Sequence, residues 1–204
     1  VYRLAAEVSS HNYRYIEATD FAKRAVALNP DDSQAAATLG LQLLRTNDEA
    51  GARVVLERAF KGDPYDVVTY NLLSMMDALD KFVTVRDSDV VVRMSADEAP
   101  VMRDYLVAFT KESLAKLSKQ WNFTPQGPIL VEMFPKHDDF AVRTMGLPGM
   151  IGALGVCFGQ VVAFDSPKAR PPGVFSWQET LWHELTHVIT IQMSNNRIPR
   201  WLTE

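Results

Sequence analysis

The chain has 204 residues, of which 47% are hydrophobic and 23% charged, as in an ordinary globular protein. Its formal net charge of −4 argues against a nucleic-acid-binding protein, which normally carries a basic face. No apolar run reaches the roughly 20 residues that span a bilayer, so we expect no membrane span in this segment. The single cysteine, Cys157, excludes an internal disulfide framework and any zinc site built from several cysteines.

Residues 15–80 are rich in alanine and leucine at helical spacing, and a repeat is visible within them. The separation of Pro30 and Pro64 along the chain equals the period of the tetratricopeptide repeat. The large and small residues of that motif are matched by Leu39, Gly40, Leu43, Ala52, Leu56 and Ala59. Arrays of this type commonly bind protein partners, and a generic helical hairpin is the alternative interpretation.

After Lys81 the pattern changes to alternating strands and helices. We expect a hairpin turning at Asp87 and Ser88, a helix over residues 98–120, a strand over 128–134, and one or two strands turning at Gly159. The glycine-rich loop over residues 146–155 lacks the Gly-Lys-Ser/Thr ending of a phosphate-binding loop. The sequence therefore predicts an α+β protein, with a helical segment over residues 1–80 and a second domain over 81–204.

A long helix is predicted to begin near Trp177. Ser176 is a favourable N-cap residue, and Glu179 completes a capping box three positions later. The helix carries the motif His183-Glu184-Leu-Thr-His187. Histidines at positions i and i+4 project from one face with Cβ atoms about 6 Å apart, so both imidazoles can bind one zinc ion.

Glu184 is rotated by about 100° from His183 around the helix and does not reach the same ion. Its carboxylate can instead accept a proton from a water molecule activated by the metal, which is the role of a general base. A zinc site of this kind needs a third protein ligand. Glu204, which follows His187 beyond the break at Pro199, is the best-placed candidate.

The motif HELTH followed by IPRWLTE resembles the gluzincin metallopeptidases of clan MA, and more narrowly the peptidase-MA-like domains that often follow tetratricopeptide repeats. The resemblance implies one Zn²⁺ per chain held by His183, His187 and Glu204, with Glu184 as general base. It also implies a peptide or protein substrate and a thermolysin-like N-terminal subdomain, which is a small twisted sheet with the zinc helix behind it. The resemblance favours a bacterial envelope or extracellular location.

In that family an edge strand before the zinc helix holds the extended substrate. The candidate here is the segment containing Gln160, Val161, Val162 and Ala163, and a plain structural strand is the alternative. The group that stabilises the oxyanion is expected beyond Glu204, since the chain reads as a piece of a longer one. The alternative function is a catalytically inactive peptidase-like binding module or a repeat-based interaction scaffold.

Other residues near the motif have more ordinary interpretations. His11 and His137 are expected to face solvent, and Cys157 is expected to be a small buried hydrophobic residue. The tryptophans Trp177, Trp182 and Trp201 are expected to pack around the zinc helix, with a substrate-pocket role open for Trp201.

Overall fold

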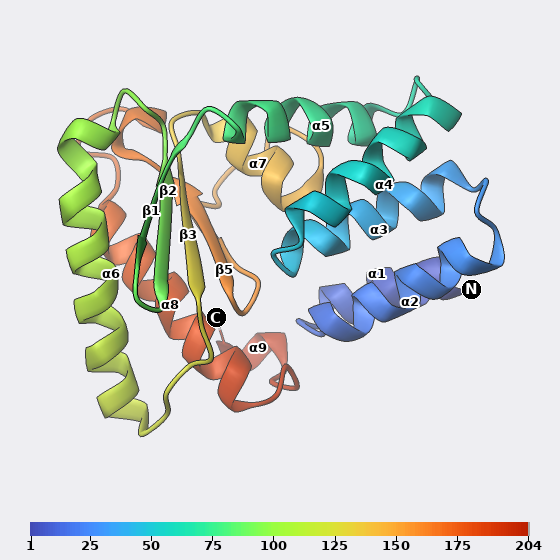
Figure 1. Ribbon diagram of the computed structural model, residues 1–204. Coiled ribbons are helices and arrows are strands. Elements are labelled where there is room, and N and C mark those ends of the chain that lie inside the picture. Colours follow the sequence, from blue (N-terminus) through green and yellow to red (C-terminus); the bar gives the residue numbers. More distant parts are fainter. Residues whose placement is uncertain (204) are drawn as a thin grey trace.

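The computed structural model describes residues 1–203 and begins with helices (Figure 1). These are α1 (Tyr2–His11), α2 (Tyr15–Leu28), α3 (Ser33–Arg45), α4 (Glu49–Gly62) and α5 (Val67–Leu79). Consecutive helices pack as antiparallel neighbours joined by short turns. The predicted prolines, Pro30 and Pro64, lie just after the ends of α2 and α4, because proline cannot donate the next helical hydrogen bond.

Local chemistry explains where these helices start and how closely they approach. The side chains of Asp32, Asp48 and Asp66 each accept a hydrogen bond from a backbone N–H in the first turn of α3, α4 and α5. Gly40 of α3 faces Leu56 of α4, and a Cβ atom at Gly40 would lie 2.5 Å from the Leu56 side chain. The small residue predicted at this position therefore lets the two helices pack in direct contact.

A five-stranded mixed sheet follows, in the order β1-β2-β3-β5-β4. Its strands are β1 (Val83–Asp87), β2 (Val90–Met94), β3 (Ile129–Phe134), β4 (Gly155–Cys157) and β5 (Val161–Asp165). β1 and β2 form the predicted hairpin, β2, β3 and β5 are parallel, and β4 pairs antiparallel with β5. Strands β3 and β5 are buried along their whole length, as expected for the centre of a sheet.

Helices cover both faces of the sheet (Figure 1). On one face α6 (Ala99–Trp121) and α8 (Trp177–Met193) pack against each other and against the strands. On the other face α7 (His137–Met145) lies between the sheet and α5. Two short helical turns, η1 (Pro167–Ala169) and α9 (Arg200–Thr203), lie before and after α8.

A buried ionic network joins the N-terminal helices α1–α5, called the helical array below, to the sheet. Arg143 of α7 and Glu132 of β3 are both fully buried and form a salt bridge of 2.7 Å. Arg143 also donates to the carbonyl oxygen of Leu44 at the end of α3, at 3.0 Å. Arg93 of β2 contacts both Glu132 and Glu49 of α4. The apolar core is likewise shared, since one cluster includes residues from α3, α5, α7 and the sheet.

The predicted α+β class is confirmed, with helices at the N-terminal end followed by a small mixed sheet. The division into domains at residues 80 and 81 stays a prediction. Within residues 1–203, no helix is long and apolar enough to cross a membrane.

Candidate metal centre

The helix that carries the histidines, α8, starts where the sequence predicts. The Ser176 side chain accepts a hydrogen bond from the backbone N–H of Glu179 at 3.3 Å, so the helix begins at Trp177. Leu181, Leu185 and Val188 are fully buried against the sheet and α6. This buried stripe fixes the rotation of α8, and the motif residues are thereby turned towards β4 and the helical array.

His183 and His187 converge on one point. Their Nε2 atoms lie 3.0 Å apart, and the two rings meet edge to face with centroids 4.6 Å apart. Two ligands of a tetrahedral zinc ion, each bound at about 2.0–2.1 Å, stand about 3.3 Å from one another. The separation of the two nitrogens therefore fits ligation of one ion, and imidazole is a ligand that zinc prefers.

Glu184 lies on the buried side of the motif, directly under strand β4. It is 6% exposed, and a Cβ atom at Gly155 would lie 2.7 Å from its Cγ atom. Its carboxylate is also close to Cys157. Burial first, and then the charge of Glu184, raise the pKa of the Cys157 thiol well above its usual range. As predicted, Cys157 is a buried small residue and stays protonated.

The third ligand of the prediction, Glu204, lies outside the described residues. Among residues 1–203 no group of three His, Cys, Asp or Glu side chains is arranged to hold a metal ion. Arg200, four positions before Glu204, lines the same cavity as His183 and His187. The structure thus brings together two of the three predicted ligands with the predicted base.

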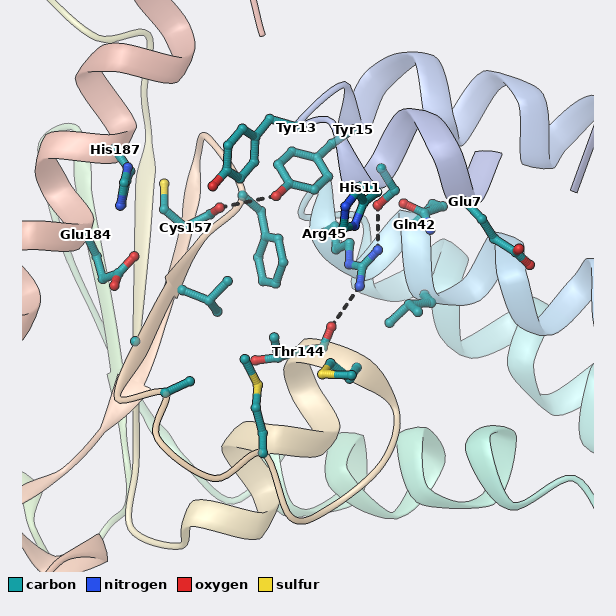
Figure 2. A pocket seen from close by; sticks show the side chains of 18 of the residues that line it. Glu7, His11, Tyr13, Tyr15, Gln42, Arg45, Thr144, Cys157, Glu184 and His187 are labelled. Carbon is teal, nitrogen blue, oxygen red and sulfur yellow. Dashed lines mark hydrogen bonds between the residues drawn. The ribbon is translucent and has the colours of Figure 1, made fainter. Parts of the chain in front are cut away.

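These residues open into a cavity of about 1120 Å³ (Figure 2). One wall is formed by the motif on α8, together with β4 and the glycine-rich loop before it. The opposite wall is formed by α1, α2 and α3, with Tyr13, Gln42 and Arg45 among the lining residues. The helical array is therefore part of the site itself, an arrangement that no sequence pattern indicated.

The prediction that β5 is the edge strand is wrong. Strand β5 lies between β3 and β4, so Val161, Val162 and Ala163 are buried and paired on both sides. Gln160 precedes the strand, and its carbonyl oxygen accepts a hydrogen bond from Leu130 of β3 at 2.9 Å. The chain does turn at Gly159, one of the two arrangements expected, and the strand before the turn, Gly155–Cys157, forms the edge instead of β5.

The ladder of β4 directs alternate backbone groups to its open edge. The Phe158 N–H donates to the Val161 carbonyl at 2.7 Å and the Leu154 carbonyl accepts from the Asp165 N–H at 2.9 Å, so Leu154 and Phe158 direct their backbone groups to β5. The intervening residues, Gly155 and Cys157, direct their backbone groups to the other side. The Tyr15 hydroxyl of α2 approaches the Cys157 carbonyl at 3.4 Å on that side. Gly155 therefore presents the backbone beside Glu184.

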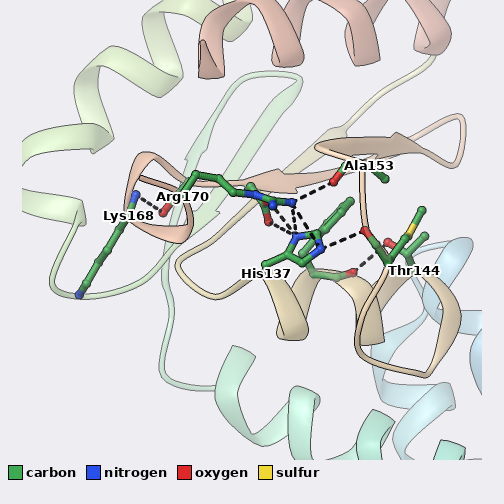
Figure 3. Close-up of polar contacts among 9 residues, drawn as sticks. His137, Thr144, Ala153, Lys168 and Arg170 are labelled. Carbon is green, nitrogen blue, oxygen red and sulfur yellow. Dashed lines mark hydrogen bonds and ion pairs between the residues drawn. The ribbon is translucent and has the colours of Figure 1, made fainter. Parts of the chain in front are cut away.

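A second polar cluster joins Asp165 to His137 and Arg170, and these two side chains hold the loop that leads into β4 (Figure 3). Asp165 is fully buried at the end of β5 and contacts the His137 ring at 2.9 Å and Arg170 at 2.6 Å. His137 reaches the carbonyl oxygen of Met150 at 3.0 Å, and Arg170 donates to that of Ala153 at 3.3 Å. The expectation that His137 faces solvent is wrong. In the sequence, the sign of this cluster was Asp165, an acidic residue at the end of an otherwise apolar strand.

The aromatic residues near the motif divide into two groups. Trp177 and Trp182 pack against the core around α8, as predicted. Trp201 is 79% exposed, so the expected packing around α8 is wrong for this side chain. His11 is exposed, as predicted.

Comparisons with protein-family models, curated proteins and solved structures gave no match.

Proposed function

We propose that this chain is a zinc-dependent peptidase, a hydrolase that cleaves peptide bonds with an activated water molecule. One observation carries the proposal. The Nε2 atoms of His183 and His187 lie 3.0 Å apart in the same cavity as the Glu184 carboxylate. The third ligand we propose is Glu204, which leaves one coordination position open, as in other catalytic zinc sites.

Each residue of the motif has a distinct chemical role. When bound, the zinc ion would lower the pKa of a water molecule and polarise the substrate carbonyl group. His183 and His187 hold the ion through neutral imidazole nitrogens. Glu184 takes the proton of the water as its oxygen adds to the carbonyl carbon, and later delivers that proton to the leaving nitrogen. The burial of Glu184 beneath β4 restricts the movement of its carboxylate.

The substrate we propose is an extended peptide that pairs with β4. An edge strand offers unpaired backbone groups on which a peptide can be added as a further strand. This role was expected for β5, but the open edge belongs to Gly155–Cys157. Pairing at Gly155 would bring a peptide bond next to Glu184, since these two residues are in direct contact.

The gluzincin and tetratricopeptide assignments are part of the same proposal. A small sheet with α8 packed against it, and an edge strand that precedes α8 in the chain, support the gluzincin assignment. The paired helices, with Pro30 and Pro64 separated by one period of the motif, support the repeat assignment. Because α1–α3 form a wall of the cavity, we infer that the array orients the peptide directly.

The decisive experiment measures metal content and peptide cleavage in the natural full-length protein. We expect one zinc ion per chain by elemental analysis and cleavage of a subset of a broad peptide library. Glu184→Gln should keep its zinc and lose cleavage, because the base is replaced while the ligands remain. His183→Ala should lose zinc. Glu112→Gln, on the exposed face of α6 and outside the cavity, is the control and should keep both properties.

Two results would contradict the proposal. Unchanged metal content in His183→Ala would show that the site is assigned to the wrong residues. A zinc-loaded protein that cleaves no peptide, but binds peptides in a manner sensitive to changes at β4, would favour the alternative of an inactive binding module.

A further inference from the structure

The turn between α1 and α2 contains a residue in an unfavourable conformation. Tyr13 has a φ of +61°, in the left-handed region that bulky side chains rarely adopt. The N–H of Tyr13 bonds to the Ser10 carbonyl at 3.2 Å, and that of Arg14 bonds to the Ser9 carbonyl at 3.0 Å. This is the Schellman pattern of a helix end, in which the left-handed position normally carries glycine or asparagine.

The rest of the chain follows that preference. Within residues 1–203, the other left-handed residues that terminate helices are Asn47, Asn122, Gly146 and Asn195. Asn47 is the equivalent of Tyr13 in the next hairpin, one repeat period later, and closes the turn with the same two hydrogen bonds. Asparagine therefore suffices for this turn, so the fold of the hairpin does not require a tyrosine at position 13.

The contacts of Tyr13 hold its side chain at the catalytic cavity. The Asn196 side chain, just after α8, donates to the Tyr13 carbonyl at 3.0 Å. The Arg200 guanidinium lies 5.2 Å from the centre of the Tyr13 ring, and Tyr15 meets the ring at 6.2 Å between centroids. Tyr13 is only 8% exposed and lines the same cavity as Glu184 and His187. Its hydroxyl points towards the side of Cys157 and His187 (Figure 2).

We propose that Tyr13 is a catalytic residue, whose hydroxyl donates a hydrogen bond to the oxyanion formed during peptide hydrolysis. The inference rests on the proposed function. It assigns to the N-terminal helical hairpin a group that was expected beyond Glu204. A positioned donor in a site shielded from water stabilises developing negative charge strongly. Strained backbone that persists at such a position is typical of functional sites.

The step balances without a further reactant. The water oxygen bonds to the carbonyl carbon, its proton moves to Glu184, and the π electron pair moves onto the carbonyl oxygen. Tyr13 donates a hydrogen bond to that oxygen and keeps its own proton. The electron pair then re-forms the carbonyl group, the C–N bond breaks, and the proton held by Glu184 passes to the leaving nitrogen.

The test compares Tyr13→Phe, Tyr13→Asn and a control, Tyr105→Phe, in the natural full-length protein. Tyr105 lies on the exposed face of α6. The measurements are zinc content, thermal stability, kcat and KM for a cleaved library peptide, and the affinity of a phosphinic analogue of that peptide. The tetrahedral, anionic phosphinate imitates the oxyanion, so its affinity reports on the donor independently of turnover.

We expect Tyr13→Phe to lower kcat by about 100-fold and to weaken phosphinate binding by about 10- to 100-fold. Its zinc content should equal that of the wild type, and its KM should change by less than about three-fold, since the donor acts in the transition state. Tyr13→Asn, which suits the turn but lacks the hydroxyl, should show the same losses of kcat and phosphinate affinity. A purely structural role would lower the melting temperature of Tyr13→Phe and leave kcat and phosphinate affinity of the folded, zinc-loaded variant unchanged.

Wild-type kcat and phosphinate affinity in Tyr13→Phe, with zinc bound, would overturn the role of Tyr13 and leave the peptidase intact. A wild-type protein without zinc or cleavage would instead overturn the proposed function, and this inference with it.

Discussion

Gly155 and Glu184 are packed so closely that a larger residue at position 155 would clash with the Glu184 side chain. A Cβ atom added to Gly155 would lie 2.7 Å from both Cγ and Oε1 of Glu184. The absence of a side chain at Gly155 therefore leaves the space that the proposed base occupies. It also brings the backbone of β4 next to the carboxylate that is expected to act on the bound peptide.

Replacement of this glycine should impair catalysis without impairing metal binding. Gly155→Ala is expected to displace the Glu184 carboxylate and to lower kcat by about 10- to 100-fold, because small misplacements of a catalytic group have large effects. Zinc content should stay unchanged, since His183 and His187 are not displaced. The shorter base in Glu184→Asp removes the clash, so Gly155→Ala should have little further effect in that background. Additive losses in the double variant would show that the two residues act independently.

The buried pair Glu132 and Arg143 should be important for stability. Glu132→Gln leaves the Arg143 charge buried without its partner, which is expected to cost about 3–5 kcal/mol in the free energy of unfolding. Urea denaturation measures the loss. The control is Glu112→Gln, which breaks the exposed pair of Glu112 and Lys116 and should change stability by less than about 1 kcal/mol. Equal effects of the two variants would contradict the importance of burial.

Cys157 should be chemically silent in the folded protein. Burial and the charge of Glu184 raise the pKa of its thiol, so the reactive thiolate is scarcer at any given pH than in a free cysteine. Alkylation by iodoacetamide at pH 8 is expected to be slow for the native protein and fast after unfolding in urea, as followed by mass spectrometry. Labelling of the native protein at the rate of a free thiol would show that the residue is accessible.

The contact between Gly40 and Leu56 provides a test of packing in the helical array. Exchange of glycine for alanine inside a helix normally stabilises it by about 1 kcal/mol. Here the added methyl group would lie 2.5 Å from the Leu56 side chain, so Gly40→Ala is expected to destabilise by about 1–3 kcal/mol instead. Leu56→Ala should cost less in the Gly40→Ala background than in the wild type. A stabilised Gly40→Ala variant would mean that the two helices are further apart.

Much of the secondary structure follows from local sequence. The cap at Ser176, the prolines after α2 and α4, and the β-branched hairpin over β1 and β2 each act over a few residues. The convergence of His183 and His187 is likewise a local feature, since a helix alone brings positions i and i+4 to one face. These features need no knowledge of the rest of the chain.

The tertiary structure decided which segments meet. Strand order placed β4 rather than β5 at the edge, and burial turned His137 into a partner of Asp165. Packing of the helical array against the sheet brought Tyr13, near the start of the chain, into the same cavity as Glu184 and His187, near its end. Periodicity reports only on neighbours along one element, so the sequence determined the helix and its motif. The second wall of the site depends on long-range packing, which no local pattern encodes.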